Sequence, residues 1–461
     1  MTKTITSLSS LVFSIVLLVS GNTLLMTLLG VRMTLAEIDT QLIGWVLVCY
    51  SLGFVLGSLY CPRIVTRVGH IRSFAVFCAL MSMVAILHPL HLNLFSWAFL
   101  RFMAGVSMAG LLLVVESWFS TRATNDNRGA LFATYQVVFY LASAGGQLLL
   151  SFASPSGTLL FSVASLLLTF ALVPLALTRL EAPSIEQVER LGLRELMGIS
   201  SLGLIAATLC GVVISAFNNI GPVYGSLINL DFNQIAFFMA TTVVAAMFFA
   251  WPLGRLSDLF DRRKVLLSLS TVAGLTSLVA AFWGHAQILA LFVSAEISIG
   301  IAASLYPVAV ALVNDRLHSN HIVPASATLL LCFGIGSCIG PILGSSMIAM
   351  LGPSGLFIGT SGCLLFLSAY TYWYIQNSKR IPVEAQETFV TTLPASTQVL
   401  MELDPRNEEF VEVGTEPEPE TEDAPEHSTA NQPTHTDPAP TSEFDATDTQ
   451  ESAGREGHER T

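Results

Sequence analysis

Charged residues are scarce in this chain of 461 residues: Asp, Glu, Lys and Arg together make up 12% of it. Soluble globular domains carry about 25% charged residues, so this composition excludes an ordinary soluble enzyme. The formal net charge of −12 argues against a nucleic-acid partner, because phosphate binding needs clustered Lys and Arg. Cysteine is also sparse, with seven residues, no Cys-x-x-Cys pair and no histidine at metal-ligand spacing. We therefore expect no disulfide, no metal site and no cofactor.

The charges that are present divide the chain into two unlike parts. From Glu384 onward there are 20 acidic residues and three arginines, whereas residues 1–380 hold 13 acidic and 18 basic residues. The acidic part is rich in Pro, Thr and Glu and poor in apolar residues, so it cannot bury enough surface to offset the entropy of folding. We expect a disordered tail, interrupted by one short apolar patch at residues 389–403.

The first 380 residues consist instead of long uncharged segments. About 20 apolar residues in a helix cross the hydrocarbon core of a membrane, which is about 30 Å thick. Segments of this length recur twelve times and predict an all-α integral membrane protein with twelve transmembrane helices. They lie near residues 8–30, 42–61, 73–91, 95–118, 130–153, 158–178, 199–222, 234–254, 265–283, 288–313, 325–350 and 355–375.

Basic residues gather in alternate connections between these segments. Sixteen of them lie on the side of the N-terminus, and one, Arg32, lies in a connection on the other side. Because basic loops stay in the cytoplasm, we expect both termini to be cytoplasmic. All six tryptophans fall at predicted segment ends, where an indole ring prefers to lie, and this supports the same topology.

An internal repeat predicts two halves of six helices each. The loop that starts at Gly57 corresponds to the loop that starts at Gly254, and Arg101 corresponds to Glu296 at a nearly equal offset. Two features in the same order are typical of pseudo-repeats. The predicted domains are residues 1–178, a basic cytoplasmic linker at 179–198, residues 199–380 and the acidic tail at 381–461.

The motifs in these repeats resemble those of the major facilitator superfamily of secondary transporters. The second-half loop has the family's Gly-x-Leu-x-Asp and following arginines at Gly254, Leu256, Asp258, Arg262 and Arg263. The first-half loop has Cys61 where the family usually has Asp, a variant that is similar to the YcaD-type bacterial branch. The family's antiporter Gly-Pro motif is absent from the fifth segment. The resemblance covers residues 5–378 and implies alternating access in a bacterial inner membrane, with export favoured by analogy.

Ionisable residues inside a membrane are costly, so each of them is a candidate for function. Arg101, Glu116 and Glu296 lie within the predicted segments. Because Arg101 and Glu296 occupy matching positions in the two halves, we expect them to approach each other across a central cavity and to couple a proton to gate opening. The alternative is a fixed structural ion pair, or two residues that each face water.

Charged residues at the cytoplasmic ends of the segments are candidates for an inner gate. These are Glu116, Arg63, Arg67 and Arg128 in the first half, and Asp258 and Arg262 in the second, where the resemblance implies the same role. The alternative for the arginines is the ordinary excess of positive charge on the cytoplasmic side.

Uncharged polar residues are candidates for solute binding. Asn22 in the first segment and Asn218 and Asn219 in the seventh occupy comparable positions, and helix-breaking residues follow the second pair. The other candidates are Tyr135, Gln136, Tyr140 and Gln147 in the fifth segment, Tyr224 in the seventh and Tyr306 in the tenth. The alternative for each is a hydrogen bond between helices.

These observations favour a secondary transporter of a small organic solute, coupled to protons and acting as a monomer. The chain has no Gly-x-x-x-x-Gly-Lys-Ser/Thr loop, which excludes ATP-driven transport by this chain alone, and nothing in it indicates an enzyme. The alternative is a membrane sensor or assembly platform whose acidic tail binds a protein partner. A channel is a third option, disfavoured by the paired loop signatures. Truncation after Arg380 separates the first two, because transport would survive it and partner capture would not.

Overall fold

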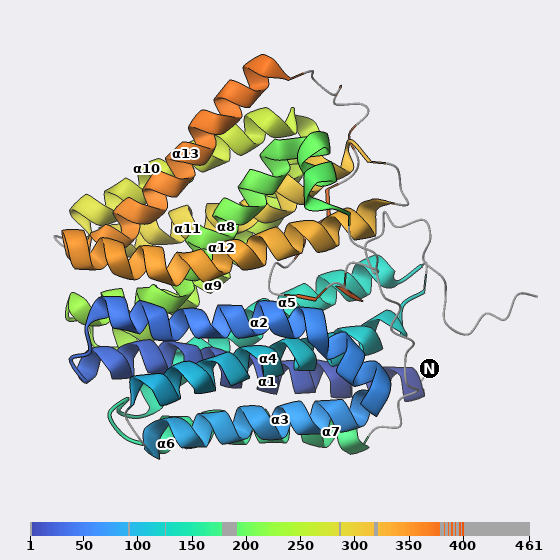
Figure 1. The fold of residues 1–461 in the computed structure, drawn as a ribbon, viewed down its shortest axis with the longest axis vertical. Helices are drawn as coiled ribbons and strands as arrows, with labels where there is room; N and C mark the ends of the chain where they lie inside the picture. The colour runs from blue at the N-terminus through green and yellow to red at the C-terminus, as the bar shows by residue number, and fades with distance from the viewer. Residues whose placement is uncertain are drawn as a thin grey trace, which may run out of the picture. The chain divides into compact units, whose positions relative to one another are not determined.

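The computed structural model describes residues 2–90, 93–124, 126–177, 191–284, 287–317 and 321–378, together with 382, 386, 389, 390, 392, 396, 397, 399 and 400. These residues form helices and no strand (Figure 1). The helices are α1 (Thr2–Leu35), α2 (Thr40–Val68), α3 (His70–Leu87), η1 (His88–Leu90), α4 (Leu94–Ser120), α5 (Arg128–Leu148), η2 (Leu149–Phe152), α6 (Leu159–Phe170), α7 (Leu172–Leu177), α8 (Leu193–Leu227), α9 (Phe232–Leu259), α10 (Arg262–Trp283), α11 (Ile288–Asn314), α12 (Ile322–Leu351) and α13 (Gly355–Asn377).

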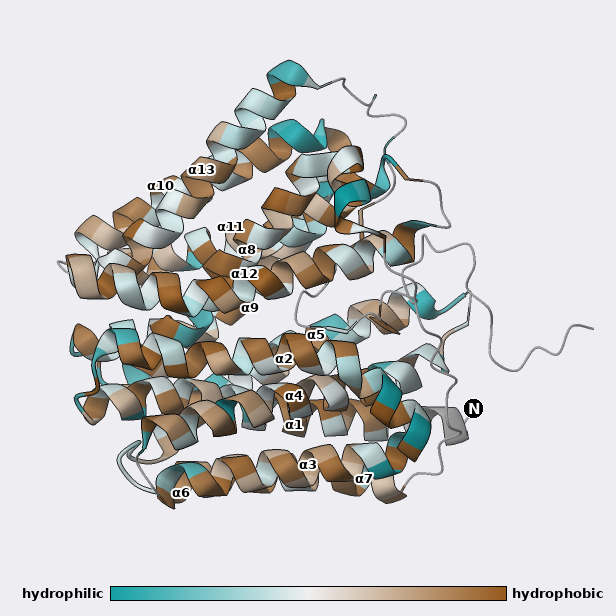
Figure 2. Cartoon of the chain, viewed as in Figure 1, coloured by the Kyte–Doolittle hydropathy of each residue, from teal (hydrophilic) through white to brown (hydrophobic). Residues whose placement is uncertain are grey.

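Apolar composition makes most of these helices membrane spans. Among the described residues, eleven helical segments are long and apolar enough to cross a membrane, with α6 and α7 counted together. The remaining long helix, α5, is more polar because it carries two tyrosines and two glutamines. Figure 2 shows hydrophobic residues along the helices and hydrophilic residues at helix ends, most clearly on the side where α1 begins. The predicted all-α, twelve-helix membrane fold is confirmed.

The helices form two six-helix pseudo-repeats whose packing follows the same scheme. In the first repeat α1 packs on α5 and α6, α2 on α4, and α3 on α4 and α6. In the second repeat the equivalent helix α8 packs on α12 and α13, α9 on α11, and α10 on α11 and α13. The two repeats meet through the pairs α1–α8, α2–α12 and α5–α9. The exact boundaries of the predicted domains stay a prediction.

Local sequence sets where several helices begin. The Asp39 side chain accepts hydrogen bonds from two backbone amides at the start of α2, and Asn93 does the same for α4. Asp231 and Gln234 form a capping box at the start of α9. These side chains satisfy amide groups that would otherwise lack partners at a helix N-terminus.

The range predicted for the linker between the repeats contains the start of a helix. Residues 178–190 lie outside the described residues, but α8 begins at Leu193, inside the range expected for the linker. The backbone at Ser200 is not helical and separates a short first part of α8 from the rest. The polar sequence before Ser200 therefore starts a helix that the hydropathy pattern alone does not reveal.

Part of the predicted tail departs from the predicted disorder. Residues 401–461 lie outside the described residues. Between Phe389 and Leu400, however, Ser396, Thr397 and Leu400 are buried, with relative exposures of 1%, 2% and 0%. These three residues pack inside the protein instead of extending into solvent.

Candidate functional site

A cavity of about 240 Å³ lies between the two repeats, with a mainly apolar lining that carries a set of uncharged polar side chains. Its walls come from α1, α2, α4 and α5 on one side and from α8, α9 and α12 on the other. Its polar lining residues include Asn22, Thr23, Ser51, Ser143, Gln147, Ser215, Asn218, Asn219 and Ser337, and its aromatic ones include Tyr50, Phe54, Phe139 and Phe333. The described residues that line it include no charged side chain. A space of this size and chemistry fits a small uncharged solute.

Two asparagines at equivalent positions of the repeats leave acceptors without partners at this cavity. The Asn219 amide donates to Ser215, to its carbonyl oxygen at 2.9 Å and its hydroxyl at 3.2 Å. The Asn22 amide nitrogen lies 3.8 Å from the sulfur of Met26. Among the described residues, the side-chain oxygens of both asparagines are buried without a hydrogen-bond partner. Such atoms are costly to leave unpaired, so they are suited to receive hydrogen bonds from a ligand.

Gln147 is held toward the same cavity from α5. Its side-chain oxygen accepts a hydrogen bond from Thr27 of α1. The hydroxyl of Thr23, one turn earlier on α1, lies 3.5 Å from that of Ser143 on α5. These contacts join α1 and α5 and fix the polar wall of the first repeat.

Five of the predicted solute-binding residues do not line the cavity as described. Tyr135 points to Glu116, and its hydroxyl donates to the Glu116 carboxylate at 2.6 Å. Tyr224 and Tyr306 lie inside the second repeat, edge-to-face with Phe357 at 5.0 Å and with Phe333 at 5.3 Å. Gln136 is buried and Tyr140 is half-buried on α5. Tyr224 and Tyr306 lie on helices whose apolar residues surround them on all sides, so no periodicity indicates the direction of these two side chains.

Glu116 has other partners than the predicted arginines. The carboxylate is fully buried near the end of α4 and accepts hydrogen bonds from the Tyr135 hydroxyl and from both the backbone amide, at 2.7 Å, and the hydroxyl of Thr397. Arg63 is exposed and lies 5.7 Å from the ring of Tyr60. The other two predicted partners are an exposed Arg67 and a half-buried Arg128. The network predicted for the first half is therefore replaced by contacts with α5 and with the segment that follows α13.

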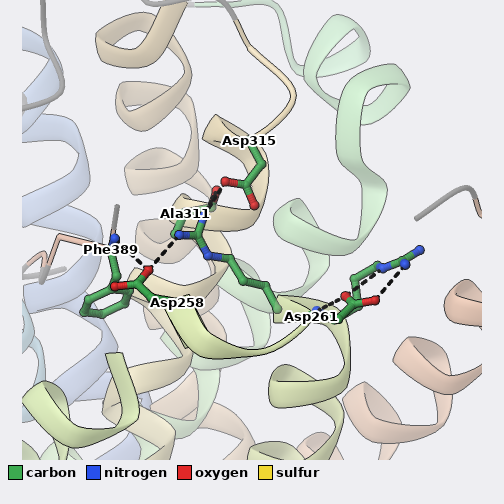
Figure 3. A network of polar contacts seen from close by, with 7 residues as sticks. Asp258, Asp261, Ala311, Asp315 and Phe389 are labelled. Atoms are coloured by element: carbon green, nitrogen blue, oxygen red, sulfur yellow. Dashed lines mark hydrogen bonds and ion pairs between the residues drawn. The ribbon is translucent and has the colours of Figure 1, made fainter. Parts of the chain in front are cut away.

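The second half contains an ion-pair network around the predicted pair (Figure 3). Arg262, 1% exposed, donates to Asp258 at 3.0 Å, to the carbonyl oxygen of Ala311 at 3.1 Å and to Asp315. Asp258 also accepts the backbone amide of Phe389 at 2.9 Å. The network ties the end of α9 and the start of α10 to the end of α11. The role of Asp258 and Arg262 in a gate stays a prediction.

Arg101 and Glu296 do not meet in this structure. Arg101 is buried with its guanidinium 5.6 Å from the ring of Tyr50 on α2, and its three side-chain nitrogens have no hydrogen-bond partner among the described residues. Glu296 is half-buried on α11, which packs on α8, α9 and α10, all within the second repeat. The expected charge pair is absent here because Arg101 faces its own repeat.

The cavity is closed on one side by direct contact between the repeats. We call the side where α1 begins and α13 ends the amino-terminal side. On the opposite side, a side chain at Gly44 of α2 would overlap Ser345 of α12, and one at Gly30 of α1 would lie 3.3 Å from Pro222 of α8. Toward the amino-terminal side, Ser396 contributes to the cavity wall. The repeats therefore touch on one side, and on the other side Ser396 lies in the wall of the cavity between them.

Several residues of the site were not predicted from the sequence. Ser215 and Ser143 each lie four residues before a predicted cavity residue, Asn219 and Gln147, and so share a helix face with it. That spacing could have identified both serines. Asp315 could have been suspected from its place beside the basic residue Arg316 at a helix end, whereas nothing in the local pattern indicated that Thr397 contacts Glu116.

Comparisons with known proteins agree with this architecture. The family model described as the Major Facilitator Superfamily matches residues 8–251 and 203–403. An uncharacterized MFS-type transporter of Yersinia enterocolitica is 29% identical over 342 residues, covering 74% of this chain and 88% of the relative. The uncharacterized MFS-type transporter YcaD of Escherichia fergusonii is also 29% identical, over 75% of this chain and 91% of its own length.

Solved transporter structures share the fold at low sequence identity. The nucleoside transporter NupG superposes with a TM-score of 0.66 at 12% identity, covering 82% of this chain and 100% of NupG. A bacterial homolog of the human lysosomal transporter Spinster, in an inward-facing and unoccupied conformation, gives a TM-score of 0.63 at 15% identity, over 83% and 98% of the two chains. Together with the family match, these likenesses show that the chain belongs to the major facilitator superfamily of membrane transporters.

Proposed function

We propose that the protein is a proton-coupled secondary transporter of a small, uncharged organic solute. The observation that supports this most is the cavity between the repeats, where Asn22 and Asn219 present unpartnered amide oxygens from equivalent positions. Amides and hydroxyls recognise solutes that carry hydrogen-bonding groups, and the lack of charged lining among the described residues favours a solute without net charge.

The contacts between the repeats support alternating access as the mechanism. In the conformation described here the pairs α1–α8 and α2–α12 close the side opposite to the amino-terminal side. Rocking of one repeat against the other would open these contacts and bring the amino-terminal ends together, so that the cavity faces each side in turn.

Proton coupling is assigned to Glu116, with Arg101 and Glu296 as further candidates. Glu116 is a fully buried carboxylate on a helix that also lines the cavity, and its partner Tyr135 lies on α5, which contacts the second repeat. A change in the packing of α4 on α5 would alter the hydrogen bonds that this carboxylate accepts, and with them its affinity for a proton.

The excess of basic residues on the amino-terminal side supports a cytoplasmic location for both termini, in a bacterial inner membrane. We propose export as the direction of transport. Everted vesicles should then accumulate solute when a proton gradient is imposed, and accumulation in right-side-out cells alone would reverse the assignment.

The experiment that tests the function is a screen followed by a transport assay. A metabolite panel is first tested for compounds that raise the melting temperature of the purified protein, because a ligand that binds the folded state stabilises it. Compounds that do so are then assayed for counterflow in proteoliposomes. Counterflow by at least one neutral compound supports the proposal, and stabilisation without any counterflow contradicts it.

Variants of the two asparagines test the location of the solute site. Asn22→Ala and Asn219→Ala should each raise KM about two- to tenfold, since a lost hydrogen bond costs about 0.5–1.5 kcal/mol. The matched control is Asn377→Ala, at the exposed end of α13, where the side chain bonds only its own helix. Equal KM values in the unmodified protein and the three variants would mean that the solute does not bind at these asparagines.

A further inference from the structure

The segment from Phe389 to Leu400 differs in chemistry from the rest of the tail. No charged residue occurs between Glu387 and Glu402, although the tail from Glu384 onward holds 20 acidic residues. Uncharged chain can enter a low-dielectric cavity without the desolvation cost that a carboxylate would incur. The composition of this segment therefore suits a place inside the protein.

Its first anchor is on the first repeat. Thr397 donates two hydrogen bonds to Glu116, one from its backbone amide at 2.7 Å and one from its hydroxyl. Both groups are buried, with exposures of 2% for Thr397 and 0% for Glu116. Two donors from one residue converge on the same carboxylate, and hydrogen bonds to a charged group are the strong ones.

Its second anchor is on the second repeat. The backbone amide of Phe389 donates to Asp258 at 2.9 Å, at the carboxylate that also pairs with Arg262 (Figure 3). The Phe389 ring lies against Gly254, where any side chain would overlap it. The glycine of the loop signature thus leaves the room that the ring occupies.

Between the anchors the segment reaches the cavity. Ser396 is one of the residues that form the cavity wall. Beyond the Thr397 anchor, Val399 and Leu400 belong to the apolar core. A stretch of the length from Phe389 to Thr397 spans at most about 29 Å, so the two anchors cannot separate beyond that distance while both hold. Phe389 and Thr397 thus contact one repeat each, and Ser396 lies in the wall of the cavity between the repeats.

We propose that the described residues between Phe389 and Leu400 (389, 390, 392, 396, 397, 399 and 400) form an entrance strap, a tethered peptide ligand at the amino-terminal opening of the cavity, which we call its mouth. The strap holds the two repeats apart on the amino-terminal side and competes with solute that enters from there. It must leave Glu116 and Asp258 before the repeats can rock. Its effect on transport rests on the proposed function, whereas its binding to the mouth does not.

Two truncations test the effect of the strap on transport. Truncation after Arg380 removes the strap, and truncation after Gly414 keeps it and removes the acidic remainder. If the strap fills the mouth in about 90% of molecules, its removal should raise the apparent solute affinity from the amino-terminal side about tenfold. The Gly414 truncation should behave like the full chain. Equal affinity in all three proteins would overturn the regulatory role.

Two substitutions in the full chain separate the strap from a general effect of shortening. Thr397→Val removes the hydroxyl but keeps the amide, and Thr397→Pro removes both donors to Glu116. The gain in apparent affinity should increase from the first variant to the second and approach that of the Arg380 truncation. A gain in the Thr397→Val variant that equals or exceeds that of Thr397→Pro would contradict the anchoring by hydrogen bonds.

A binding measurement tests the strap without any transport. Hydrogen exchange of the Thr397 amide in the full chain should be slow, and Thr397 should exchange faster after Asp258→Asn if the two anchors cooperate. A labelled peptide of residues 386–403 should bind the full chain carrying Thr397→Pro in fluorescence anisotropy, and the same peptide with Thr397→Pro should bind at least about tenfold more weakly. Fast exchange at Thr397 with no peptide binding would overturn the strap, whatever the transport assays show.

Discussion

At the scale of single residues, both ends of the entrance strap are held by the same kind of contact. A backbone amide donates to a carboxylate, Glu116 in the first repeat and Asp258 in the second. Glu116 is buried without a cationic partner among the hydrogen bonds and ion pairs of the described residues, whereas Asp258 shares Arg262 with Asp315. The two anchors therefore differ in their electrostatics, and of these two carboxylates Glu116 is the one better suited to exchange a proton.

Glu116→Gln should abolish the dependence of transport on a proton gradient but leave solute exchange at equilibrium in place. The amide keeps an oxygen that accepts the Thr397 amide, but it cannot take up a proton. The measurement compares gradient-driven uptake with counterflow in the same proteoliposomes, and Glu195→Gln, at an exposed position of α8, is the matched control. Unchanged gradient-driven transport in the Glu116 variant would assign the coupling to another residue.

Arg262→Ala should lower the free energy of unfolding by about 3–5 kcal/mol, because it leaves the nearly buried Asp315 and part of Asp258 without their cation. Arg262→Lys should recover only part of the lost free energy of unfolding. An ammonium group cannot reproduce the planar set of hydrogen bonds that the Arg262 guanidinium donates to Asp258, Ala311 and Asp315. Denaturant unfolding in micelles measures both. A loss below about 1 kcal/mol for the alanine variant would mean that the network is solvated.

At the scale of helices, close crossings at small residues position the walls of the cavity. Gly336 of α12 lies against the backbone of Thr208 on α8, and Gly211 of α8 lies against Phe333 on α12. Small residues let membrane helices approach this closely, so that backbone contacts replace side-chain packing. The crossing fixes Ser215, Asn219 and Ser337 relative to one another, and Ser215 donates to the Ser337 carbonyl oxygen at 2.7 Å.

Gly336→Val should destabilise the protein by about 1–3 kcal/mol and weaken solute binding, because the added side chain must push α8 and α12 apart. Gly362→Val is the matched control, since a side chain at Gly362 of α13 would meet no atom within 4 Å. Thermal unfolding and the apparent solute affinity are measured for both. Equal behaviour of the two variants would show that the crossing is not tightly packed.

The sequence predicted the helices better than it predicted their rotation. Long uncharged runs identify a membrane helix, but a run that is apolar on all sides does not say which face is inside. Asn22, Gln147, Asn218 and Asn219 line the cavity, and their role in solute binding stays a prediction, whereas Tyr224 and Tyr306 turn into the packing of the second repeat. The hydropathy pattern assigns the polar start of α8 to the linker, because hydropathy detects membrane contact and not helix formation.

At the scale of the whole molecule, the net charge of −12 hides a basic membrane part and an acidic tail. That composition predicted a disordered tail with one apolar patch at residues 389–403, but it did not predict that residues of this patch are buried against distant parts of the chain. Contacts between residues so far apart in sequence leave no local pattern. The alternative function, a platform acting through the acidic tail, stays a prediction for the residues beyond the strap.

Rocking of the two repeats around the cavity would change the distances at both ends of the helix pair α2 and α12, so these distances test it directly. Spin labels are placed on α2 and α12 in the full chain with its native cysteines replaced, at Gln41 and Met350 on the closed side and at Val68 and His321 on the amino-terminal side. Double electron–electron resonance is then measured with and without the most stabilising solute. If the repeats rock, solute should lengthen the Gln41–Met350 distance and shorten the Val68–His321 distance. Two distances that stay constant, or that change in the same direction, would contradict it.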